Sequence, residues 1–296
     1  MERLEDIILK NCGPLLPLPT EVEPRLDRME NIKAVLFDVY GTLIVSGSGD
    51  VGTATAIDTA EALTQALVVS GFEGDLEQAG IIGKDMLKQE ILAWHKAGRE
   101  AGADYPEVEI IKVWKKILDS FCNTETLRSA KPDIEQVRRF ALEYECRVNP
   151  VYPMPGCMEA LASIKERGLP MGIVSNAQFY TPPVFTAFFG KTLGEVGFDP
   201  ECCIWSYKEL KAKPSANLFP KAGKFLEKNH GIKLSETVYV GNDMLNDIYT
   251  AKQAGCKTVL FAGDQRSLRL REDDGRCKNL QPDAVITSLN QLPDLI

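Results

Sequence analysis

Histidine is almost absent from this chain of 296 residues, which contains only His95 and His230. The count excludes a histidine-rich metal site. We expect surface or packing roles for both residues, and Gly231 marks His230 as the end of a helix. Any metal ion in this protein should therefore be held by oxygen atoms, which favours magnesium.

Paired cysteine motifs and long apolar runs are missing as well. The eight cysteines form no CxxC pair, so we expect reduced, mostly buried thiols and neither a disulfide framework nor a zinc site. The first residues, "MERLEDIILK", place charges where a signal peptide needs an apolar run. No segment approaches the ~18 apolar residues of a membrane span. These absences predict a cytoplasmic protein without a membrane partner.

Positive charge is in the minority. The chain has 34 Lys and Arg residues against 42 Asp and Glu residues, and its formal net charge is -8. This balance argues against general binding of nucleic acid or of anionic membranes. With 44% hydrophobic residues the chain can bury a sizeable core, and its length suits one large domain or a domain with an insertion.

Four regions follow one another along the chain. Residues 1–30 include "GPLLPLPTEVEP", whose proline density predicts an N-terminal extension that continues as an arm after one short helix. Residues 31–46 hold a buried strand, "IKAVLFDVY", which ends in a Gly-Thr turn. Residues 47–150 show apolar residues at helical spacing without a convincing strand, whereas residues 151–296 alternate between strands and helices.

This alternation predicts a parallel sheet with helices on both faces, so one α/β domain is split by a helical insertion. The helices expected in the insertion are "TATAIDTAEALTQALVVSGF", "KDMLKQEILAWHKAGREAG", "PEVEIIKVWKKILDSF" and "DIEQVRRFALEYE". The helices expected after it are "CMEALASIKERG", "TPPVFTAFFGKTLGE", "SANLFPKAGKFLEKNH" and "LNDIYTAKQAG". The strands expected there are "PMGIVSNA", "CCIWSY", "TVYVGND", "KTVLFAG" and "DAVITS".

Polar clusters fall at or just after four of the strand ends. They are Asp38 with Thr42, Ser175 with Asn176, Lys213, and Asp243 with Asp247. In open α/β sheets the functional site lies at the carboxyl ends of the strands. Each cluster alone is explained by a helix cap or a solvated side chain, but four in this order on one sheet indicate an active site.

The residue types in these clusters suit phosphoryl transfer. The Asp38 carboxylate can attack phosphorus or carbon and form a covalent intermediate. Near a dianionic phosphate its charge needs an offset, which a magnesium ion held by carboxylate and backbone oxygens provides. Ser175 and Thr42, with Asn176 and nearby amides, can bind the remaining phosphoryl oxygens. Lys213 adds a compact positive charge.

The four motifs of the haloacid dehalogenase (HAD) superfamily resemble "FDVYGTL", "IVSNA", "KAKPSANLF" and "VYVGNDMLNDI" in this chain, and "YPMPGCMEAL" resembles the return from cap to core. The resemblance covers residues 31–46 and nearly everything after residue 150. It implies a hydrolase with a Rossmann-like core and an α-helical cap inserted at 47–150. It also implies Asp38 as nucleophile, Ser175 as phosphate binder, Lys213 as the motif-three lysine, and Asp243 and Asp247 as motif-four acids.

Tyr40 departs from the pattern of the superfamily's phosphatases, which usually have a second aspartate two residues after the nucleophile. That aspartate protonates the leaving group and then activates water, a contribution typically worth ~10²–10⁴-fold. The Tyr40 carbonyl can still bind magnesium, but a phenol with a pKa of about 10 is a poor base at neutral pH. We therefore expect either a leaving group that departs unaided or a proton donor supplied by the cap or the substrate.

Two groups of residues are candidates for further roles. Tyr105, Glu107 and Glu109 in the cap could donate the missing proton, although a helix start with acids in its first turn explains them equally well. Arg266, Arg269 and Arg271 could reach an anionic substrate, although a solvated basic loop explains these three better. In "GND" either Asn242 or Asp243 could face a metal ion, and we favour Asp243.

Three interpretations remain open. Tyrosine at position 40 also resembles the superfamily's metal-free 2-haloacid dehalogenases, whose halide leaves without a proton. Those enzymes use an arginine from the early cap, whereas no arginine occurs here between Arg28 and Arg99. They also lack motif-four acids, and two such acids without a cation would raise each other's pKa. The third interpretation is a non-catalytic binding protein that keeps the fold.

We favour a magnesium-dependent, phosphatase-type hydrolase that acts on a small, anionic phosphorylated metabolite. In this interpretation the metal ligands come from Asp38, the Tyr40 carbonyl, Asp243 and Asp247.

Overall fold

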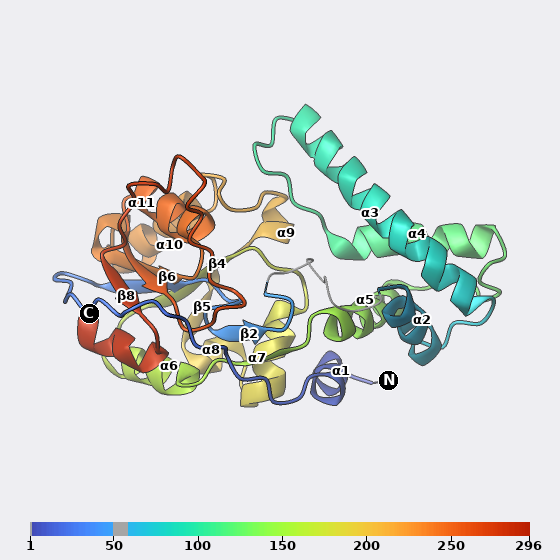
Figure 1. Ribbon diagram of the computed structural model, residues 1–296, viewed down its shortest axis with the longest axis horizontal. Helices are drawn as coiled ribbons and strands as arrows, with labels where there is room; N and C mark the ends of the chain where they lie inside the picture. Colours follow the sequence, from blue (N-terminus) through green and yellow to red (C-terminus); the bar gives the residue numbers. More distant parts are fainter. Residues whose placement is uncertain (1, 50–58) are drawn as a thin grey trace.

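The computed structural model describes residues 2–49 and 59–296. Its main body is a six-stranded sheet with the strand order β5-β4-β1-β6-β7-β8, in which every neighbouring pair is parallel (Figure 1). The strands are β1 Ala34–Phe37, β4 Met171–Ser175, β5 Phe198–Trp205, β6 Thr237–Gly241, β7 Lys257–Phe261 and β8 Ala284–Ile286. The predicted Rossmann-like parallel sheet is confirmed.

Helices cover both faces of the sheet because successive side chains of a strand point to opposite sides. Val35 and Phe37 of β1 belong to the core that includes α6, α7, α8 and η3, whereas Ala34 and Leu36 belong to the core that includes α10 and α11. On the first face lie α6 Cys157–Glu166, α7 Thr181–Phe189, α8 Leu193–Val196 and the 3-10 helix η3 Leu289–Leu295. On the second lie α10 Phe219–His230 and α11 Thr250–Gln253, and the short helices α9 Ser206–Glu209 and η1 Leu234–Glu236 stand in the connections.

The strand order sets the place of the site. β1 lies between β4 and β6, so the chain leaves the sheet centre in opposite directions on its two sides. At such a switch point the loops after neighbouring strands diverge and leave a crevice at the carboxyl edge. The polar residues that follow β1, β4 and β6 therefore meet there.

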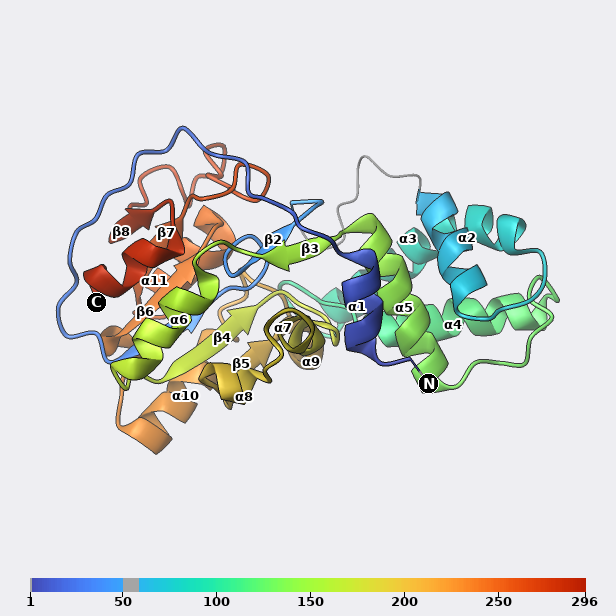
Figure 2. The same cartoon turned by 90° about the horizontal axis from the view of Figure 1, so that it is seen from below.

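A helical segment, residues 59–148, lies beside the sheet region (Figures 1 and 2). It consists of α2 Thr59–Val69, α3 Leu76–Glu100, α4 Ile110–Asn123 and α5 Ile134–Val148. Its core contains Trp114, whose ring centroid lies 5.0 Å from those of Phe140 and Tyr144. The four predicted helices are present, although the predicted start of the first lies outside the described residues.

A small antiparallel pair, β2 Ile44–Ser46 and β3 Val151–Pro153, flanks this segment in the sequence. The sequence prediction missed both strands, because three residues are too few to show alternation. The pair brings the two chain connections of the helical segment side by side.

The N-terminal extension begins with α1 Leu4–Asn11, which packs against α5 and α7 (Figure 2). The chain then runs without regular structure to the far edge of the sheet, where Arg25 and Val285 exchange backbone hydrogen bonds of 2.8 and 2.9 Å. The expected short helix and arm are both present, and the arm joins the helical segment to the sheet edge.

In the helical segment, α3 begins eight residues before the predicted Lys84 and α4 begins four residues after the predicted Pro106. Three of the helices predicted after residue 150 also differ from the structure. "TPPVFTAFFGKTLGE" is two helices, because Gly190 adopts a left-handed conformation after α7 and Thr192 caps α8. α10 begins at Phe219 and not at Ser215, with a proline in its first turn. "LNDIYTAKQAG" starts as the π-helix η2 Met244–Tyr249 before α11 continues it.

The described residues bear on two expectations from the sequence, which concern disulfide bonds and membrane-spanning helices. All eight cysteines are free thiols, and seven of them are buried. None of the helices within residues 2–49 and 59–296 is both long and apolar enough to cross a membrane.

Candidate active site

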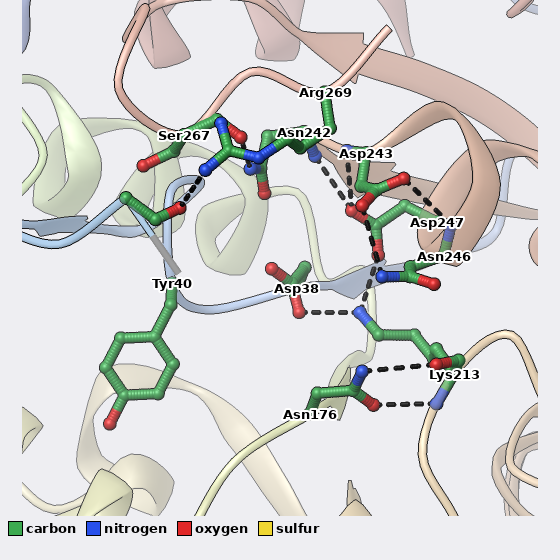
Figure 3. Close-up of a pocket in the computed structure, with 11 residues that line it drawn as sticks. Asp38, Tyr40, Asn176, Lys213, Asn242, Asp243, Asn246, Asp247, Ser267 and Arg269 are labelled. Carbon is green, nitrogen blue, oxygen red and sulfur yellow. Dashed lines mark hydrogen bonds and ion pairs between the residues drawn. The ribbon is translucent and has the colours of Figure 1, made fainter. Parts of the chain in front are cut away.

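A narrow polar cavity opens at the carboxyl edge of the sheet (Figure 3). The space in it that is open to water is only about 40 Å³, so it suits a small group. Its described lining comes from the loops after five strands and from one glycine after β2. The lining residues are Asp38, Tyr40, Gly49, Asn176, Lys213, Asn242, Asp243, Asn246, Asp247, Ser267 and Arg269.

The ammonium group of Lys213 is the centre of this site. Its Nζ lies 2.6 Å from Asp38 Oδ1 and 2.5 Å from Asp247 Oδ1 (Figure 3). It also donates to the hydroxyl of Tyr239 at 2.9 Å, and its side chain is buried. One cation therefore holds the carboxylates of β1 and η2 together.

Asn176 fixes the backbone that carries this lysine. Its Oδ1 accepts from the Lys213 amide at 2.7 Å, and its Nδ2 donates to the Lys213 carbonyl at 3.3 Å. The side chain at the end of β4 thus clamps the loop after β5, and the cation is held rigidly beside Asp38.

Burial and charge shift the pKa values in this cluster. Burial raises the pKa of Asp247 to about 7 although Lys213 opposes it, and the negative charges of Asp38 and Asp243 raise it further. Burial alone would lower the pKa of Lys213, but Asp247 and Asp38 favour the charged form more strongly, so the pKa is raised. Lys213 is therefore a permanent positive charge at neutral pH.

Asp38 keeps one oxygen available for chemistry. Its Oδ1 accepts from Lys213, whereas its Oδ2 receives no hydrogen bond from any described residue. The backbone amide of Asp38 donates to the Val240 carbonyl at 2.9 Å and anchors the residue at the strand end. A carboxylate with one fixed and one unengaged oxygen in a cavity has the geometry of a nucleophile.

Tyr40 directs its ring away from the polar cluster (Figure 3). Its hydroxyl lies 2.9 Å from the hydroxyl of Thr181 on α7. Burial raises its pKa far above the ordinary value for a phenol. The Tyr40 hydroxyl therefore supplies neither acid nor base to the cavity, as the sequence analysis expected.

The residues of "GND" and Asp247 have distinct partners. Asn242 accepts from Thr42 at 3.1 Å and donates to the Ser267 carbonyl at 2.6 Å, so its side chain stabilises the loops. Asp243 caps η2 by accepting from the amides of residues 245 and 246. The second oxygen of Asp247, Oδ2, accepts from the amides of Asn242 and Asp243 at 2.9 Å.

Oxygen donors for a cation lie at the ends of β1 and β6. No group of three or more His, Cys, Asp and Glu side chains that could hold a metal ion occurs within residues 2–49 and 59–296. The donors are the carboxylates of Asp38 and Asp243 and the Tyr40 carbonyl, which accepts no hydrogen bond from a described residue. Magnesium commonly binds one or two carboxylates and keeps several waters, so this set fits magnesium.

Asp243 also pairs with an arginine. The Arg271 guanidinium donates to Asp243 Oδ2 at 2.6 Å and lies 3.1 Å from Oδ1 through Nε. A cation at Asp243 would share the carboxylate with this side chain. The basic composition of the loop that holds Arg266, Arg269 and Arg271 did not predict this ion pair.

Ser175 and Thr42 lie behind the cavity wall and not among its lining residues. Ser175 is fully buried, and its hydroxyl donates to the Asn176 carbonyl at 3.4 Å. Thr42 is also fully buried and donates to Asn242. Of the four residues predicted to bind substrate, the structure places Asn176 and Lys213 on the cavity surface.

The three cap candidates for proton donation lie outside the described cavity lining. Tyr105 accepts from Arg276 at 2.8 Å, and Glu107 accepts from the Ser206 hydroxyl at 2.8 Å. Glu109 pairs with Lys112 of its own helix. Tyr105 and Glu107 instead belong to a docking loop, residues 104–108, that contacts the loop of Lys213.

Sequence reasoning missed several functional neighbours. Tyr239 was expected only as a strand residue, yet its hydroxyl contacts Lys213. Ser267 and Arg269 line the cavity from the loop after β7, and Asn246 lines it from η2. The basic composition of "GDQRSLRLRED" gave a signal for Arg269, but it did not separate this residue from its neighbours.

Comparison with known proteins places this geometry in a family context. The chain matches the family of haloacid dehalogenase-like hydrolases over residues 32–255. The phosphoglycolate phosphatase of Photorhabdus laumondii is 30% identical over 238 residues, which cover 78% of this chain and 80% of that protein. The phosphoglycolate phosphatase of Shigella boydii is 25% identical over 284 residues, which cover 90% and 93%.

The fold also has a counterpart among solved structures. The 2-haloacid dehalogenase from Pseudomonas syringae pv. tomato aligns with a TM-score of 0.54 and 21% identity, covering 89% of this chain and 97% of that one. This likeness shows a shared fold.

Proposed function

Because the chain belongs to the haloacid dehalogenase-like hydrolases and is a hydrolase, we propose that it cleaves the phosphate ester of a small anionic metabolite with the help of magnesium. The observation that carries this proposal is the unengaged Asp38 Oδ2 beside a buried, permanently charged Lys213. The two phosphoglycolate phosphatases that resemble the chain over most of its length support the same reaction class.

Each residue at the reacting centre has a role in this proposal. Asp38 attacks phosphorus through Oδ2 and forms an aspartyl-phosphate, which water then hydrolyses. Lys213 holds the attacking carboxylate through Oδ1 and offsets negative charge as it develops on the phosphoryl oxygens. Asn176 holds the backbone of Lys213 in place.

The metal would be held by Asp38, the Tyr40 carbonyl and Asp243. Magnesium, when bound, would offset the repulsion between the carboxylates and a phosphate dianion. Asp247 has both oxygens engaged by Lys213 and by two backbone amides. Asp243 is engaged as well, but one of its partners is the partly exposed Arg271, which a metal ion could replace, whereas Lys213 is buried. We therefore assign Asp247 to positioning Lys213 and the turn of Asp243, in place of the ligand role expected from the sequence.

The leaving group departs without help from residue 40. Since the Tyr40 hydroxyl bonds to Thr181 and its pKa is raised, no proton comes from that side chain. The helical segment would act as a cap that shields the reaction from water, docked through residues 104–108. The free thiols support a reducing, cytoplasmic location.

A metal-free 2-haloacid dehalogenase is the second candidate. Two observations favour it: Tyr40 offers no acid, which halide would not need, and Arg271 neutralises Asp243 without a metal ion. In that reaction Asp38 would attack carbon and release halide.

An activity screen separates the two candidates. Phenyl phosphate, 2-phosphoglycolate, acetyl phosphate and 2-chloropropionate are each incubated with the protein, with magnesium and with excess chelator. Phosphate release that needs magnesium and is abolished in Asp38→Asn supports the phosphatase. Chloride release that persists in chelator would establish the dehalogenase instead.

A further inference from the structure

The loop after β7 is fixed against the turn that carries Asp243. The Arg269 amide donates to the Asn242 carbonyl at 3.0 Å, and the Met244 amide donates to the Arg269 carbonyl at 2.8 Å. Residues of this loop therefore hold a defined position beside the reacting centre, unlike a solvated basic loop.

The Arg269 guanidinium lines the cavity without a carboxylate partner. Its terminal nitrogens donate to the carbonyls of Gly49 at 3.1 Å, Arg266 at 2.6 Å and Leu268 at 3.1 Å. It forms no ion pair with a described residue. Five N–H donors meet three acceptors, so donors remain for another group.

This situation differs from that of the other cations nearby. Lys213 is paired with two carboxylates and Arg271 with Asp243, whereas the described partners of Arg269 are neutral carbonyl groups. The described cavity lining contains two cations, Lys213 and Arg269. Of these two, Arg269 is the one whose charge is available to an anionic ligand.

Ser267 supplies a second, independent indication. Its side chain is 1% exposed and lines the same cavity, yet its hydroxyl has no hydrogen-bond partner among residues 2–49 and 59–296. A buried hydroxyl without a partner is costly, and a ligand oxygen would satisfy it.

We propose that Arg269 and Ser267 bind a carboxylate of the substrate, so that the preferred substrates are small phosphorylated hydroxy acids. Figure 3 shows both residues on the opposite side of Asp38 from Lys213 and Asn176, which leaves the phosphoryl group between the two cationic sides. A planar guanidinium binds a carboxylate through two parallel hydrogen bonds. The narrow cavity requires the two anionic groups of the substrate to be a few bonds apart.

This inference rests on the proposed function, and a binding experiment tests it separately from turnover. Asp38→Asn protein, which holds ligand without cleaving it, is titrated by calorimetry with 2-phosphoglycolate and with its carboxamide. The two ligands have the same phosphoryl group and differ in the carboxylate charge. Adding Arg269→Gln should weaken binding of 2-phosphoglycolate by about 10- to 100-fold and reduce its preference over the carboxamide by a similar factor.

Two further variants complete the test. Ser267→Ala should weaken 2-phosphoglycolate binding about 3- to 10-fold, with little effect on the carboxamide. Arg266→Gln is the matched control, because Arg266 lies on the same loop but contacts the Leu16 carbonyl and Asp264 outside the cavity. It should leave both affinities within about twofold.

Two results would overturn the assignment. Equal losses for both ligands in Arg269→Gln would show that the arginine binds the phosphoryl group, and unchanged affinity would show that it binds neither group. Failure of the proposed function would give a different result. The protein would bind 2-phosphoglycolate, and Arg269→Gln would still weaken that binding, but the natural protein would cleave no phosphate ester.

Discussion

The sheet region and the helical segment bury different kinds of side chains. Around the strand ends, Asp38, Lys213 and Asp247 are buried and bonded to one another. In residues 59–148 the interior is built from apolar and aromatic residues such as Trp114 and Phe140, and Glu143 is the one charged residue that is fully buried there. None of the described cavity lining comes from the helical segment.

The two regions meet at a polar contact close to the reacting centre. Tyr105 accepts from the amide of residue 212 at 2.8 Å through its carbonyl, and the amide of Glu107 donates to residue 210 at 3.1 Å. Asp104 accepts from Ser215 at 2.8 Å. These contacts involve residues 210, 212 and 215, which lie on both sides of Lys213 in the sequence. The helical segment therefore contacts the loop that carries Lys213. The difference is that the sheet region supplies the described cavity lining, whereas the helical segment contacts that region beside Lys213.

The largest expected effect comes from Asp38→Asn. The amide keeps the shape of the side chain but cannot attack phosphorus, so turnover should fall by on the order of 10⁴-fold or more. The measurement is magnesium-dependent phosphate release, with thermal unfolding to show that the variant is folded. Asp119→Asn, at a surface ion pair of the helical segment, is the control and should stay within about twofold. Comparable losses of turnover in both variants would show that the reacting groups are not confined to the sheet region.

Lys213→Met should combine loss of activity with loss of stability. It leaves the buried carboxylates of Asp38 and Asp247 facing each other, which costs about 3–5 kcal/mol of unfolding free energy. Denaturant unfolding measures this, and Lys116→Met, at an exposed pair with Glu90, is the control with a cost of about 0–1 kcal/mol.

The stability loss in Lys213→Met should depend on pH. The pKa of Asp247 is already raised to about 7, and removal of the lysine raises it further. The folded state then binds a proton that the unfolded chain releases above about pH 4, so the unfolding free energy increases as pH falls from 8 towards 5. A deficit that stays constant over this range would show that removal of Lys213 does not change the pKa of Asp247.

Tyr40→Asp sharpens the comparison at the reacting centre. An aspartate at this position offers a proton donor, so hydrolysis of alkyl phosphates should rise by at most ~10²–10⁴-fold, and aryl phosphates should gain less. The measurement is log kcat/KM against leaving-group pKa for both proteins. Tyr40→Phe is the control: it removes only the bond to Thr181 and should leave the slope unchanged. A flat plot for the natural protein would mean that another group donates the proton.

Asp104→Ala should give the smallest effect. It removes the carboxylate that accepts from Ser215, a contact worth about 1 kcal/mol, so kcat should fall about fivefold through looser docking near Lys213. Glu109→Ala is the control, because Glu109 pairs with Lys112 on its own helix. Steady-state kinetics of both variants measure the difference. An effect of Glu109→Ala equal to that of Asp104→Ala would show that general charge, and not docking, is responsible.

Local sequence patterns were sufficient for the elements that rest on local forces. The apolar run before Asp38 predicted β1, and the alternation after residue 150 predicted the parallel sheet, because burial of a strand fixes its composition. Helix boundaries were predicted wrongly at Gly190, whose left-handed conformation ends α7, and at Phe219, where α10 begins with a proline in its first turn. The strands β2 and β3 were missed because their pairing joins residues that are far apart in the chain.

The sequence alone indicated that Asp38, Lys213 and Asp247 meet, because parallel strands end at one edge and carry their loops there. Only the tertiary structure decided how they pair. Lys213 reaches Asp38 across 175 residues and Asp247 across 34, and each contact engages one oxygen of the carboxylate. The outward turn of Tyr40 and the unpaired charge of Arg269 likewise depend on neighbours from other elements, because hydrogen bonds form between atoms that packing brings within about 3 Å.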